Sequence, residues 1–403
     1  MKALIKPSQA HGDIVAPTSK SAAHRLLIAA ALSEDKSIIS GVTKSEDVLA
    51  TVDCLRALGA SIESDGDVFT VRGCDMTKNA PNGILSCRES GSTLRFLIPV
   101  ASLSGAKVTM TGSEKLLSRP LSVYEKIYDD RELLLKKIGS LLFVDGPLPS
   151  GEYEIPGNVS SQFISGLLFA LPLTKGDSTL KIIPPFASKP YVDMTVDTLE
   201  KFGIAVDFSD ELTIKISGNQ KYSGINTSVE GDYSGAAFLE ALNLFGSEIN
   251  VLGLNKNSKQ GDSAYGKFYK LLKDGTPTID IESCPDLAPI LFTVAAAYNG
   301  ATFTSTARLK IKESDRVDAM ARELRKFGAD IKAFEDSVVV KKATLHSPEE
   351  ELFGHNDHRV VMSLSVLASV YGGTVNGTEA VSKSYPDFFR DIKNAGIEVL
   401  LYD

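Results

Sequence analysis

The feature that most constrains the fold is a pattern that occurs six times: an amphipathic, helix-like stretch, then a glycine, then a short apolar strand. The six glycines are Gly59, Gly139, Gly203, Gly275, Gly328 and Gly396. Glycine readily adopts the left-handed conformation that commonly ends a helix, so each copy is predicted to form helix, cap and strand. The copies are too far apart and too unevenly spaced for a solenoid, whose repeats span roughly 20 to 50 residues. We therefore expect six copies of one unit, arranged as two globular halves of three units each.

Length and composition agree with two large domains. The chain has 403 residues and 43% of them are hydrophobic, which suffices for two or three domains of about 150 residues with cores of their own. No low-complexity linker is present, so the boundaries must be short crossings between units. We place them near residues 17 and 228. Residues 1–17 and 229–403 then form the domain that carries both termini, and residues 18–228 form an inserted domain.

The charge and the apolar pattern exclude several classes of protein. A net charge of −8 argues against nucleic-acid binding, because phosphate backbones need a basic surface. The longest uncharged apolar stretch, residues 163–174, is far shorter than the roughly 20 residues of a membrane span. The N-terminus has no secretory pattern, and the four cysteines form no CxxC motif or disulfide framework. These features predict a cytoplasmic protein with reduced thiols and no membrane partner.

Polar and basic residues stand at the start of a predicted helix in residues 17–25 (PTSKSAAHR). A serine can cap the helix there, and Lys20 and Arg25 lie in its first turns. A helix start has unpaired N–H groups and the positive end of the helix dipole, so added basic side chains make it attractive to anions. For this segment alone, a capped helix with solvated charges is the simpler explanation.

Residues 89–95 (ESGSTLR) repeat this arrangement. Gly91 lets backbone approach a ligand, Ser92 or Thr93 can cap the helix, and Arg95 lies just inside it. Most of the further segments of this kind also lie at a helix start or on the loop before one: residues 117–120 (LSRP), 160–163 (SSQF), 188–191 (SKPY), 284–289 (CPDLAP), 312–316 (KESDR), 356–359 (NDHR) and 382–387 (SKSYPD). If repeated units aim equivalent helix starts the same way, both halves would bind one small polyanion in a cleft and close on it.

Two other kinds of site are poor matches. Residues 355–358 (HNDH) offer two histidines without a cysteine or a clear third ligand, so they make a weak metal candidate. Residues 261–267 (GDSAYGK) have the glycine and lysine spacing of a P-loop, but Phe268 replaces the Ser or Thr that holds magnesium. We predict neither a metal nor an ATP site.

Seven segments, in order across nearly the whole chain, resemble motifs of the 5-enolpyruvylshikimate-3-phosphate (EPSP) synthase family of enolpyruvyl transferases. They are TSKSAAHR (18–25), ESGSTLR (89–95), SRP (118–120), SSQ (160–162), KESDR (312–316), NDHR (356–359) and KSYPD (383–387). The resemblance implies an α/β fold, a two-domain inside-out α/β barrel in which each domain has three repeated β-α-β-α-β-β units. It also implies an active site in the cleft between the domains.

The resemblance further implies an activity. The family transfers the enolpyruvyl group of phosphoenolpyruvate to the 5-hydroxyl of shikimate 3-phosphate by addition and elimination, and it releases phosphate. This is a step of the shikimate pathway, which leads to chorismate and the aromatic amino acids. The reaction uses no metal and no cofactor. We expect a monomer that closes its domains on these anionic substrates, with glyphosate as an inhibitor.

The family's motifs assign roles to particular residues. Asp286 is expected to take the proton of the 5-hydroxyl, and Glu313 to protonate the methylene carbon, with Lys20 as a third catalytic residue. The residues expected at shikimate 3-phosphate are Lys20, Ser21, Arg25, Ser160, Ser161, Gln162, Ser188, Asp286 and Lys312. Those expected at phosphoenolpyruvate are Lys20, Gly91, Arg119, Gln162, Arg316, Arg359 and Lys383.

The chain departs from the family pattern in a few places. Glu89 stands where the family commonly has Asn, and Ser92 replaces a Thr, which leaves affinity for phosphoenolpyruvate and glyphosate open. Arg308 takes a position that supplies an Asn in some members, so that contact is not transferred. The register of residues 121–140 is also uncertain against the family.

Three alternatives remain open. The sister enzyme that acts on UDP-N-acetylglucosamine commonly carries a reactive cysteine before its Arg-Pro, and residues 111–120 have none, although some sister enzymes have Asp there. An anion sensor on the same scaffold would gain nothing from two carboxylates beside anionic ligands. An RNA 3′-phosphate cyclase would need a nucleotide-accepting histidine and a surface suited to RNA.

Overall fold

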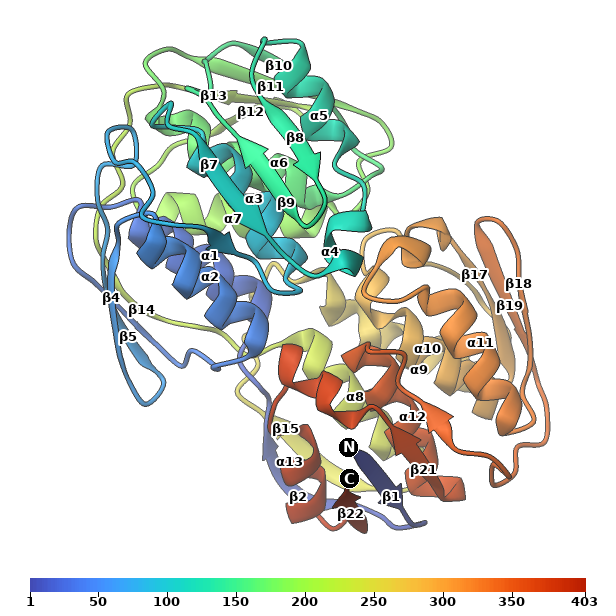
Figure 1. Cartoon of the computed structure of the whole chain (residues 1–403). Helices are drawn as coiled ribbons and strands as arrows, with labels where there is room; N and C mark the ends of the chain where they lie inside the picture. The colour runs from blue at the N-terminus through green and yellow to red at the C-terminus, as the bar shows by residue number, and fades with distance from the viewer. The chain divides into compact units, whose positions relative to one another are not determined.

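The computed structural model describes residues 1–403, and the chain divides into two compact units (Figure 1). Unit 1 consists of Met1–Ser19 and Gly231–Asp403, and unit 2 of Lys20–Glu230. The predicted boundaries, after residues 17 and 228, each lie two residues before the observed ones. Both termini belong to unit 1, where the first and last strands pair antiparallel.

Unit 2 is built from three four-stranded sheets. Its strands are β3 (Ser37–Ser40), β4 (Ser61–Asp65), β5 (Val68–Arg72), β6 (Leu85–Ser86), β7 (Val108–Thr111), β8 (Leu135–Ile138), β9 (Leu141–Val144), β10 (Glu152–Pro156), β11 (Ser178–Ile183), β12 (Asp207–Asp210), β13 (Thr213–Ile216) and β14 (Asn226–Ser228). The sheet orders are β14-β3-β5-β4, β6-β7-β9-β8 and β10-β11-β13-β12. In each sheet the first pair is parallel and the other two pairs are antiparallel.

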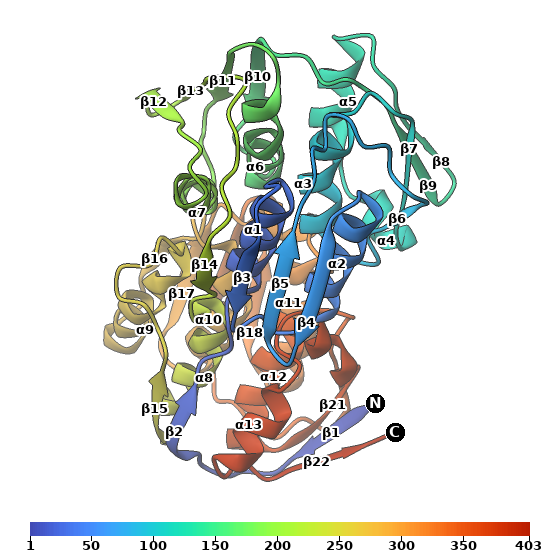
Figure 2. The same ribbon diagram turned by 90° about the vertical axis from the view of Figure 1, so that its left-hand side faces the viewer.

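The helices of unit 2 supply most of its core. They are α1 (Lys20–Ala31), α2 (Glu46–Ala57), α3 (Gly91–Ala101), α4 (Glu114–Ser118), α5 (Ser122–Asp129), α6 (Ser161–Ala170) and α7 (Lys189–Lys201), with a 3-10 turn η1 (Leu171–Leu173). Nearly every residue of α3 and α6 is buried, because these helices are predominantly apolar beyond their polar first turns. Figure 2 shows α1 and α2 beside the sheet of β3, β4 and β5, which they contact.

Unit 1 repeats this plan with two four-stranded sheets and one pair of strands. Its strands are β1 (Lys2–Ile5), β2 (His11–Val15), β15 (Glu248–Leu252), β16 (Thr278–Asp280), β17 (Gly300–Thr304), β18 (Asp330–Ala333), β19 (Ser337–Lys341), β20 (Leu352–Phe353), β21 (Gly373–Asn376) and β22 (Val399–Tyr402). The orders are β20-β21-β1-β22, β16-β17-β19-β18 and β15-β2. The first two sheets have the same sequence of parallel and antiparallel pairs as the sheets of unit 2.

Unit 1 has six helices, the last four of which begin near the predicted site segments. The six helices are α8 (Tyr233–Leu244), α9 (Tyr265–Asp274), α10 (Ala288–Ala297), α11 (Arg316–Lys326), α12 (His358–Tyr371) and α13 (Phe388–Asn394). The 3-10 turns are η2 (Gly261–Ala264), η3 (Pro285–Leu287), η4 (Ala307–Ile311) and η5 (Thr378–Lys383). Each unit has its own hydrophobic core, with the central residues of α10 and α12 in that of unit 1.

The predicted α/β class and the six-fold repeat are confirmed, while no closed barrel forms: the strands make six separate sheets. The full unit is visible in β10-α6-β11-α7-β12-β13, and also in β16-α10-β17-α11-β18-β19. Two sheets include a strand from a distant part of the chain. In the sheet β14-β3-β5-β4 this strand is β14, and in the sheet β20-β21-β1-β22 it is β1.

Two of the six glycines by which the repeat was recognised do not form the expected left-handed helix cap. Gly139 forms the turn between β8 and β9, so the expected helix there is wrong. The helix of that unit is α5, which ends at Asp129, and residues 135–138 instead pair with β9, because strand pairing overrides local helix propensity. Gly275 does follow helix α9, but its φ of 178° is extended. The left-handed cap is present at Gly59, Gly203, Gly328 and Gly396.

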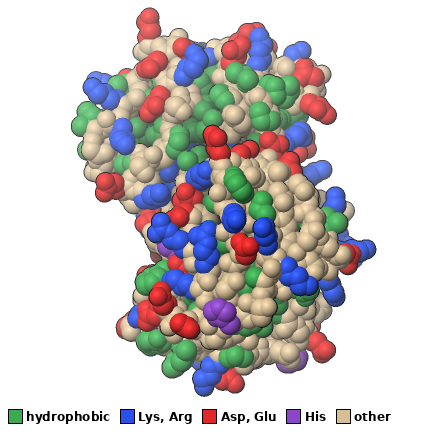
Figure 3. All heavy atoms as spheres, turned by 90° about the vertical axis from the view of Figure 1, so that its right-hand side faces the viewer, with side chains coloured by type: hydrophobic (Ala, Val, Ile, Leu, Met, Phe, Trp, Pro, Cys, Tyr) green, Lys and Arg blue, Asp and Glu red, His purple; other side chains and the backbone are tan.

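One face of the surface carries charged side chains of both signs (Figure 3). On this face, basic and acidic side chains are interspersed. None of the helices combines the length and the apolar character that crossing a membrane requires.

Candidate active site

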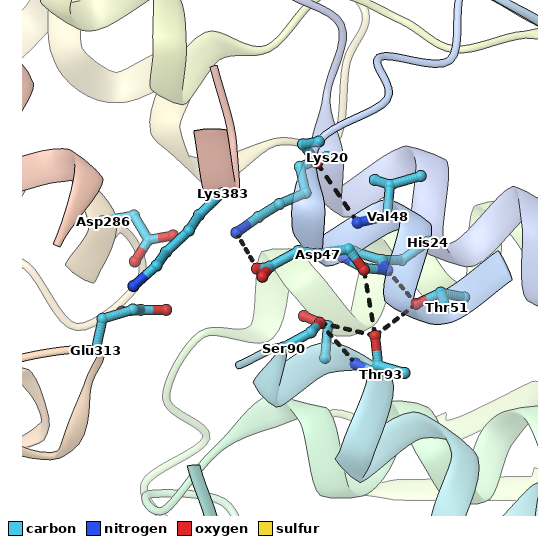
Figure 4. Close-up of polar contacts among 12 residues, drawn as sticks. Lys20, His24, Asp47, Val48, Thr51, Ser90, Thr93, Asp286, Glu313 and Lys383 are labelled. Atoms are coloured by element: carbon cyan, nitrogen blue, oxygen red, sulfur yellow. Dashed lines mark hydrogen bonds and ion pairs between the residues drawn. The ribbon is translucent and has the colours of Figure 1, made fainter. Parts of the chain in front are cut away.

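The N-terminal end of α1 presents two of the predicted basic residues of unit 2. Lys20 is the first residue of this helix, and its Nζ lies 2.8 Å from Oδ2 of Asp47 on α2 (Figure 4). Both side chains are largely buried, so this ion pair fixes the direction of the lysine. The sequence did not single out Asp47, because no motif surrounds it.

Arg25, one turn further along α1, is bonded to neutral oxygens. Its guanidinium donates to Oγ1 of Thr195 at 2.8 Å and to the carbonyls of Ser21 and Tyr191, both at 2.7 Å. Burial lowers the pKa of Arg25 to about 10, which still leaves it protonated at neutral pH. A buried cation that has neutral partners is well suited to attract a phosphate.

The start of α3 gathers three residues predicted at phosphoenolpyruvate. A Cβ on Gly91 would lie 3.0 Å from NH1 of Arg119 and 3.7 Å from Oε1 of Gln162. Glycine at this position therefore makes room for the arginine. Gln162 also accepts from Arg95 at 2.8 Å and donates to Oγ of Ser92 at 3.0 Å. Arg95 and Ser92 are thus part of this group, although the sequence assigned them no substrate.

The observed cap of α3 differs from the prediction. Ser90 is the N-cap and accepts from the N–H of Thr93, whereas Ser92 or Thr93 was expected. Thr93 instead joins a buried chain of hydrogen bonds: its Oγ1 lies 2.7 Å from Oγ of Ser90 and 2.6 Å from Oγ1 of Thr51, which in turn lies 2.7 Å from Nδ1 of His24. This chain links α1, α2 and α3 close to their starts (Figure 4).

Three further serines predicted at shikimate 3-phosphate lie at the starts of α6 and α7. Ser160 caps α6 and Ser161 begins it, as the sequence predicted for this segment. Ser188 precedes α7, the helix that holds Arg25 through Thr195 and Tyr191, and its φ is 57°. We call Lys20, Ser21, Arg25, Gly91, Arg119, Ser160, Ser161, Gln162 and Ser188 the unit 2 cluster.

In unit 1 a single buried arginine holds three carboxylates. Arg316 begins α11 with 1% of its side chain exposed, and it lies 2.8 Å from each of Asp286, Glu313 and Asp357. Burial alone would lower the pKa of Arg316, but these three negative charges raise it well above the ordinary arginine value. Asp357 is fully buried, caps α12 and also accepts from Ser314. Asp357 lies inside the NDHR segment, but the sequence assigned it no substrate or catalytic role.

Asp286 is bonded to three cations. Its carboxylate lies 2.8 Å from Arg316, 2.7 Å from Arg359 and 3.4 Å from Lys312. Burial alone would raise the pKa of Asp286, but Arg359, Lys312 and Arg316 hold it well below its usual range. Burial also lowers the pKa of Lys312. Asp286 is therefore an ionised, cation-stabilised carboxylate.

Lys383 completes the basic groups of unit 1. It is the last residue of the 3-10 turn η5, and its Nζ donates to the backbone carbonyl of Asn356 at 2.7 Å. Its side chain extends toward Asp286 and Glu313 (Figure 4). We call Asp286, Lys312, Glu313, Arg316, Arg359 and Lys383 the unit 1 cluster. All six were predicted from the sequence.

Basic clusters at helix starts of repeated α/β units, one of which also holds a pair of carboxylates, agree with the enolpyruvyl transferase class that the sequence motifs indicated. The solved structures agree: an EPSP synthase from Acinetobacter baumannii superposes with a TM-score of 0.81 at 25% identity, covering 99% of this chain and all of that one. Another structure of an EPSP synthase from the same organism gives a TM-score of 0.81 at 24% identity.

Sequence comparison gives the particular family. Residues 4–392 match the profile of EPSP synthase (3-phosphoshikimate 1-carboxyvinyltransferase). The 3-phosphoshikimate 1-carboxyvinyltransferases of Clostridium perfringens (strain SM101 / Type A) and Clostridium kluyveri are 39% and 40% identical, each over 98% of this chain and over 98% and 97% of their own lengths. The chain belongs to the EPSP synthase family. The predicted family, enzyme class and reaction, enolpyruvyl transfer from phosphoenolpyruvate to shikimate 3-phosphate in the shikimate pathway, are confirmed.

Proposed function

We propose that the two clusters act together in this transfer, with the phosphate of shikimate 3-phosphate bound by unit 2 and proton transfer carried out by unit 1. The observation that supports this division is Arg316, which holds both Asp286 and Glu313 at 2.8 Å. Proton transfer in two directions needs two groups kept in fixed positions near one reacting centre.

Shikimate 3-phosphate is proposed to bind Lys20, Ser21, Arg25, Ser160, Ser161, Gln162 and Ser188, together with Asp286 and Lys312. Arg25 is the anchor, because its neutral partners leave its charge available to a phosphate. The hydroxyl groups at the starts of α6 and α7 add neutral donors, and the two helix starts themselves favour an anion.

Phosphoenolpyruvate is proposed to bind Lys20, Gly91, Arg119, Gln162, Arg316, Arg359 and Lys383. Gly91, Arg119 and Gln162 already adjoin one another, so one anion could contact all three. The same anion on Arg316 and Arg359 would draw these arginines away from Asp286. Because those cations hold the pKa of Asp286 low, their withdrawal would raise it and make Asp286 a stronger base.

The proposed chemistry then has two stages. Asp286 removes the proton of the 5-hydroxyl as the oxygen attacks phosphoenolpyruvate, and Glu313, which first takes up a proton from solvent, protonates the methylene carbon. In the elimination the two groups exchange roles, a proton leaves the new methyl group, and phosphate departs. The basic residues, including Lys20, stabilise the carboxylate and phosphate of the intermediate.

Several further properties follow from this proposal. The units are proposed to close on shikimate 3-phosphate, which would appear as compaction in small-angle scattering. Glyphosate, an anion with a phosphonate and a carboxylate, is proposed to inhibit by competing with phosphoenolpyruvate. The chain is proposed to act as a monomer, since one copy supplies every residue named above, and in the cytoplasm, which would suit its four free cysteines. Light scattering on the purified protein would test whether it is a monomer.

The decisive experiment measures phosphate release with both substrates and with each omitted. Release should require shikimate 3-phosphate and phosphoenolpyruvate together, and mass spectrometry should find the enolpyruvyl ether. Equal release with shikimate 3-phosphate replaced by UDP-N-acetylglucosamine would contradict the proposal and favour the sister activity.

A further inference from the structure

The turn before α12 has a strained backbone. His355 and Asn356 lie between β20 and α12, with φ values of 50° and 53°. Two consecutive residues with side chains in the left-handed region are uncommon, even though His and Asn tolerate it better than most. Such a turn persists only where surrounding contacts hold it in place.

A single buried carboxylate supplies those contacts. Glu323 on α11 has 3% of its side chain exposed. Its Oε1 lies 2.8 Å from Nε2 of His355, and its Oε2 accepts from the N–H of Phe353 at 2.9 Å and from Nζ of Lys326 at 2.8 Å. Phe353, the last residue of β20, and His355, the first of the two left-handed residues, therefore both bond to the carboxylate of Glu323. An ionised carboxylate can only accept, so Nε2 of His355 is the donor.

The turn carries groups that hold three of the proposed phosphoenolpyruvate ligands. The carbonyl of Asn356 accepts from Lys383 at 2.7 Å. The next residue, Asp357, binds Nε of Arg316 at 2.8 Å and the N–H of Arg359 at 2.9 Å. A backbone carbonyl points where its φ and ψ direct it, so a change in the turn would move the acceptor that orients Lys383.

We propose that Glu323 and His355 are a positioning pair for phosphoenolpyruvate: they hold the 355–356 turn in its left-handed form and thereby aim Lys383. Neither residue touches the substrate. The inference rests on the proposed role of Lys383, which is tested in parallel below. No sequence motif indicated Glu323, which lies on the buried side of helix α11.

The test compares variants by the KM for each substrate, kcat and thermal stability. His355→Asn keeps a residue that tolerates positive φ, but its shorter amide does not reach Glu323. We expect the KM for phosphoenolpyruvate to rise about tenfold, the scale of one lost charge-assisted hydrogen bond. The KM for shikimate 3-phosphate should change by less than about twofold. Glu323→Gln, which keeps the shape but loses the charge, should act in the same direction.

Lys326→Met is the matched control. It removes the other charged partner of Glu323 and keeps an unbranched side chain over the ring of Phe353, which Lys326 covers at 4.8 Å. It should alter stability without changing the KM for phosphoenolpyruvate. A loss of stability in His355→Asn and Glu323→Gln with an unchanged KM for phosphoenolpyruvate would show a merely structural role and overturn the proposal.

Lys383→Met separates this inference from the function on which it rests. If this variant leaves the KM for phosphoenolpyruvate unchanged, the proposed role of Lys383 is wrong, and the positioning pair falls with it. If Lys383→Met raises that KM while His355→Asn does not, only the positioning pair is wrong. If His355→Asn does not fold, Glu323→Gln carries the same comparison.

Discussion

The buried arginines of the two clusters have partners of opposite character, neutral in unit 2 and negatively charged in unit 1. In unit 2, Arg25 is bonded to a hydroxyl and two backbone carbonyls. In unit 1, Arg316 is bonded to three carboxylates. Burial lowers the pKa of Arg25, whereas in Arg316 the carboxylates outweigh burial and raise it.

Under the proposed roles of the two clusters, this difference separates substrate binding from proton transfer. A buried cation with neutral partners gains most from an incoming anion, because no charge has to be displaced. A cation that already holds carboxylates gains less, but it fixes the positions of groups that exchange protons and it controls their pKa. The repeated units of the fold thus provide equivalent helix starts, and the side chains at each start decide which task it performs.

The largest expected difference concerns stability. Arg316→Met should lower the free energy of unfolding by about 3–5 kcal/mol, because three carboxylates lose their common partner. Arg25→Met should change it by only about 1 kcal/mol, since only neutral hydrogen bonds are lost and a buried charge is removed. Urea unfolding of the two variants, followed by circular dichroism, gives both values. Equal destabilisation of the two variants would contradict the proposed difference between the clusters. If Arg25→Met binds shikimate 3-phosphate as well as the parent chain does, Arg25 is not the phosphate anchor.

A change in the proposed acid should affect turnover and spare binding. Glu313→Gln removes the proton donor but keeps the size of the side chain, so kcat should fall by about 10² or more. Binding of shikimate 3-phosphate, measured by calorimetry, should remain within about threefold. Near-normal turnover would exclude Glu313 as the acid. Lost binding would instead place the residue at the substrate.

The two units should also respond to acid at different pH values. Burial, together with Lys20 and Arg25, holds the pKa of His24 well below its ordinary value of 6.5. Below that value the unfolded chain takes up a proton that the folded chain does not, so stability falls by up to about 1.4 kcal/mol per pH unit. The depressed pKa of Asp286 also makes stability fall with falling pH, but in a lower range: its stabilising contribution is fully present above about 3.8, its ordinary value, and is lost as pH falls from there through the lower folded value.

The measurement compares the parent chain with His24→Asn in urea at pH 7.5, 6.0 and 5.0. We expect the parent to lose more stability over this range than the variant. Parallel pH dependences would show that His24 is not the group that responds.

The members of both clusters were predicted through the resemblance to the family's motifs, with KESDR and NDHR supplying Arg316 and Arg359. The local rule for helix starts, that caps, dipoles and glycine turns involve neighbouring residues, marked these segments only as candidate anion sites. The same local rule misplaced the cap of α3. Both Ser90 and Thr93 can cap a helix, and only the packing of α2 against α3 decides that Thr93 turns to Thr51.

Residues that act through distant partners could not be predicted. Asp47 reaches Lys20 across 27 positions, and Glu323 reaches His355 across 32. Such pairs depend on how helices are packed, which no single-sequence periodicity contains. The misread Gly139 has the same origin, because pairing of β8 with β9 decided the structure there against the local pattern.

A smaller effect than that of Arg316→Met is expected in the buried hydroxyl chain of unit 2. Thr93→Val keeps the shape of the side chain but removes the oxygen that joins Thr51 to Ser90, so the free energy of unfolding should fall by about 1–3 kcal/mol, the penalty for an unsatisfied buried partner. Thr93→Ser keeps the hydroxyl and should retain most of the stability. Because this chain also sets the start of α3, the KM for phosphoenolpyruvate should rise severalfold in Thr93→Val and recover in Thr93→Ser. If the valine variant loses stability while its KM is unchanged, the chain supports the fold of unit 2 without placing Gly91, and the start of α3 is then set by its Ser90 cap alone.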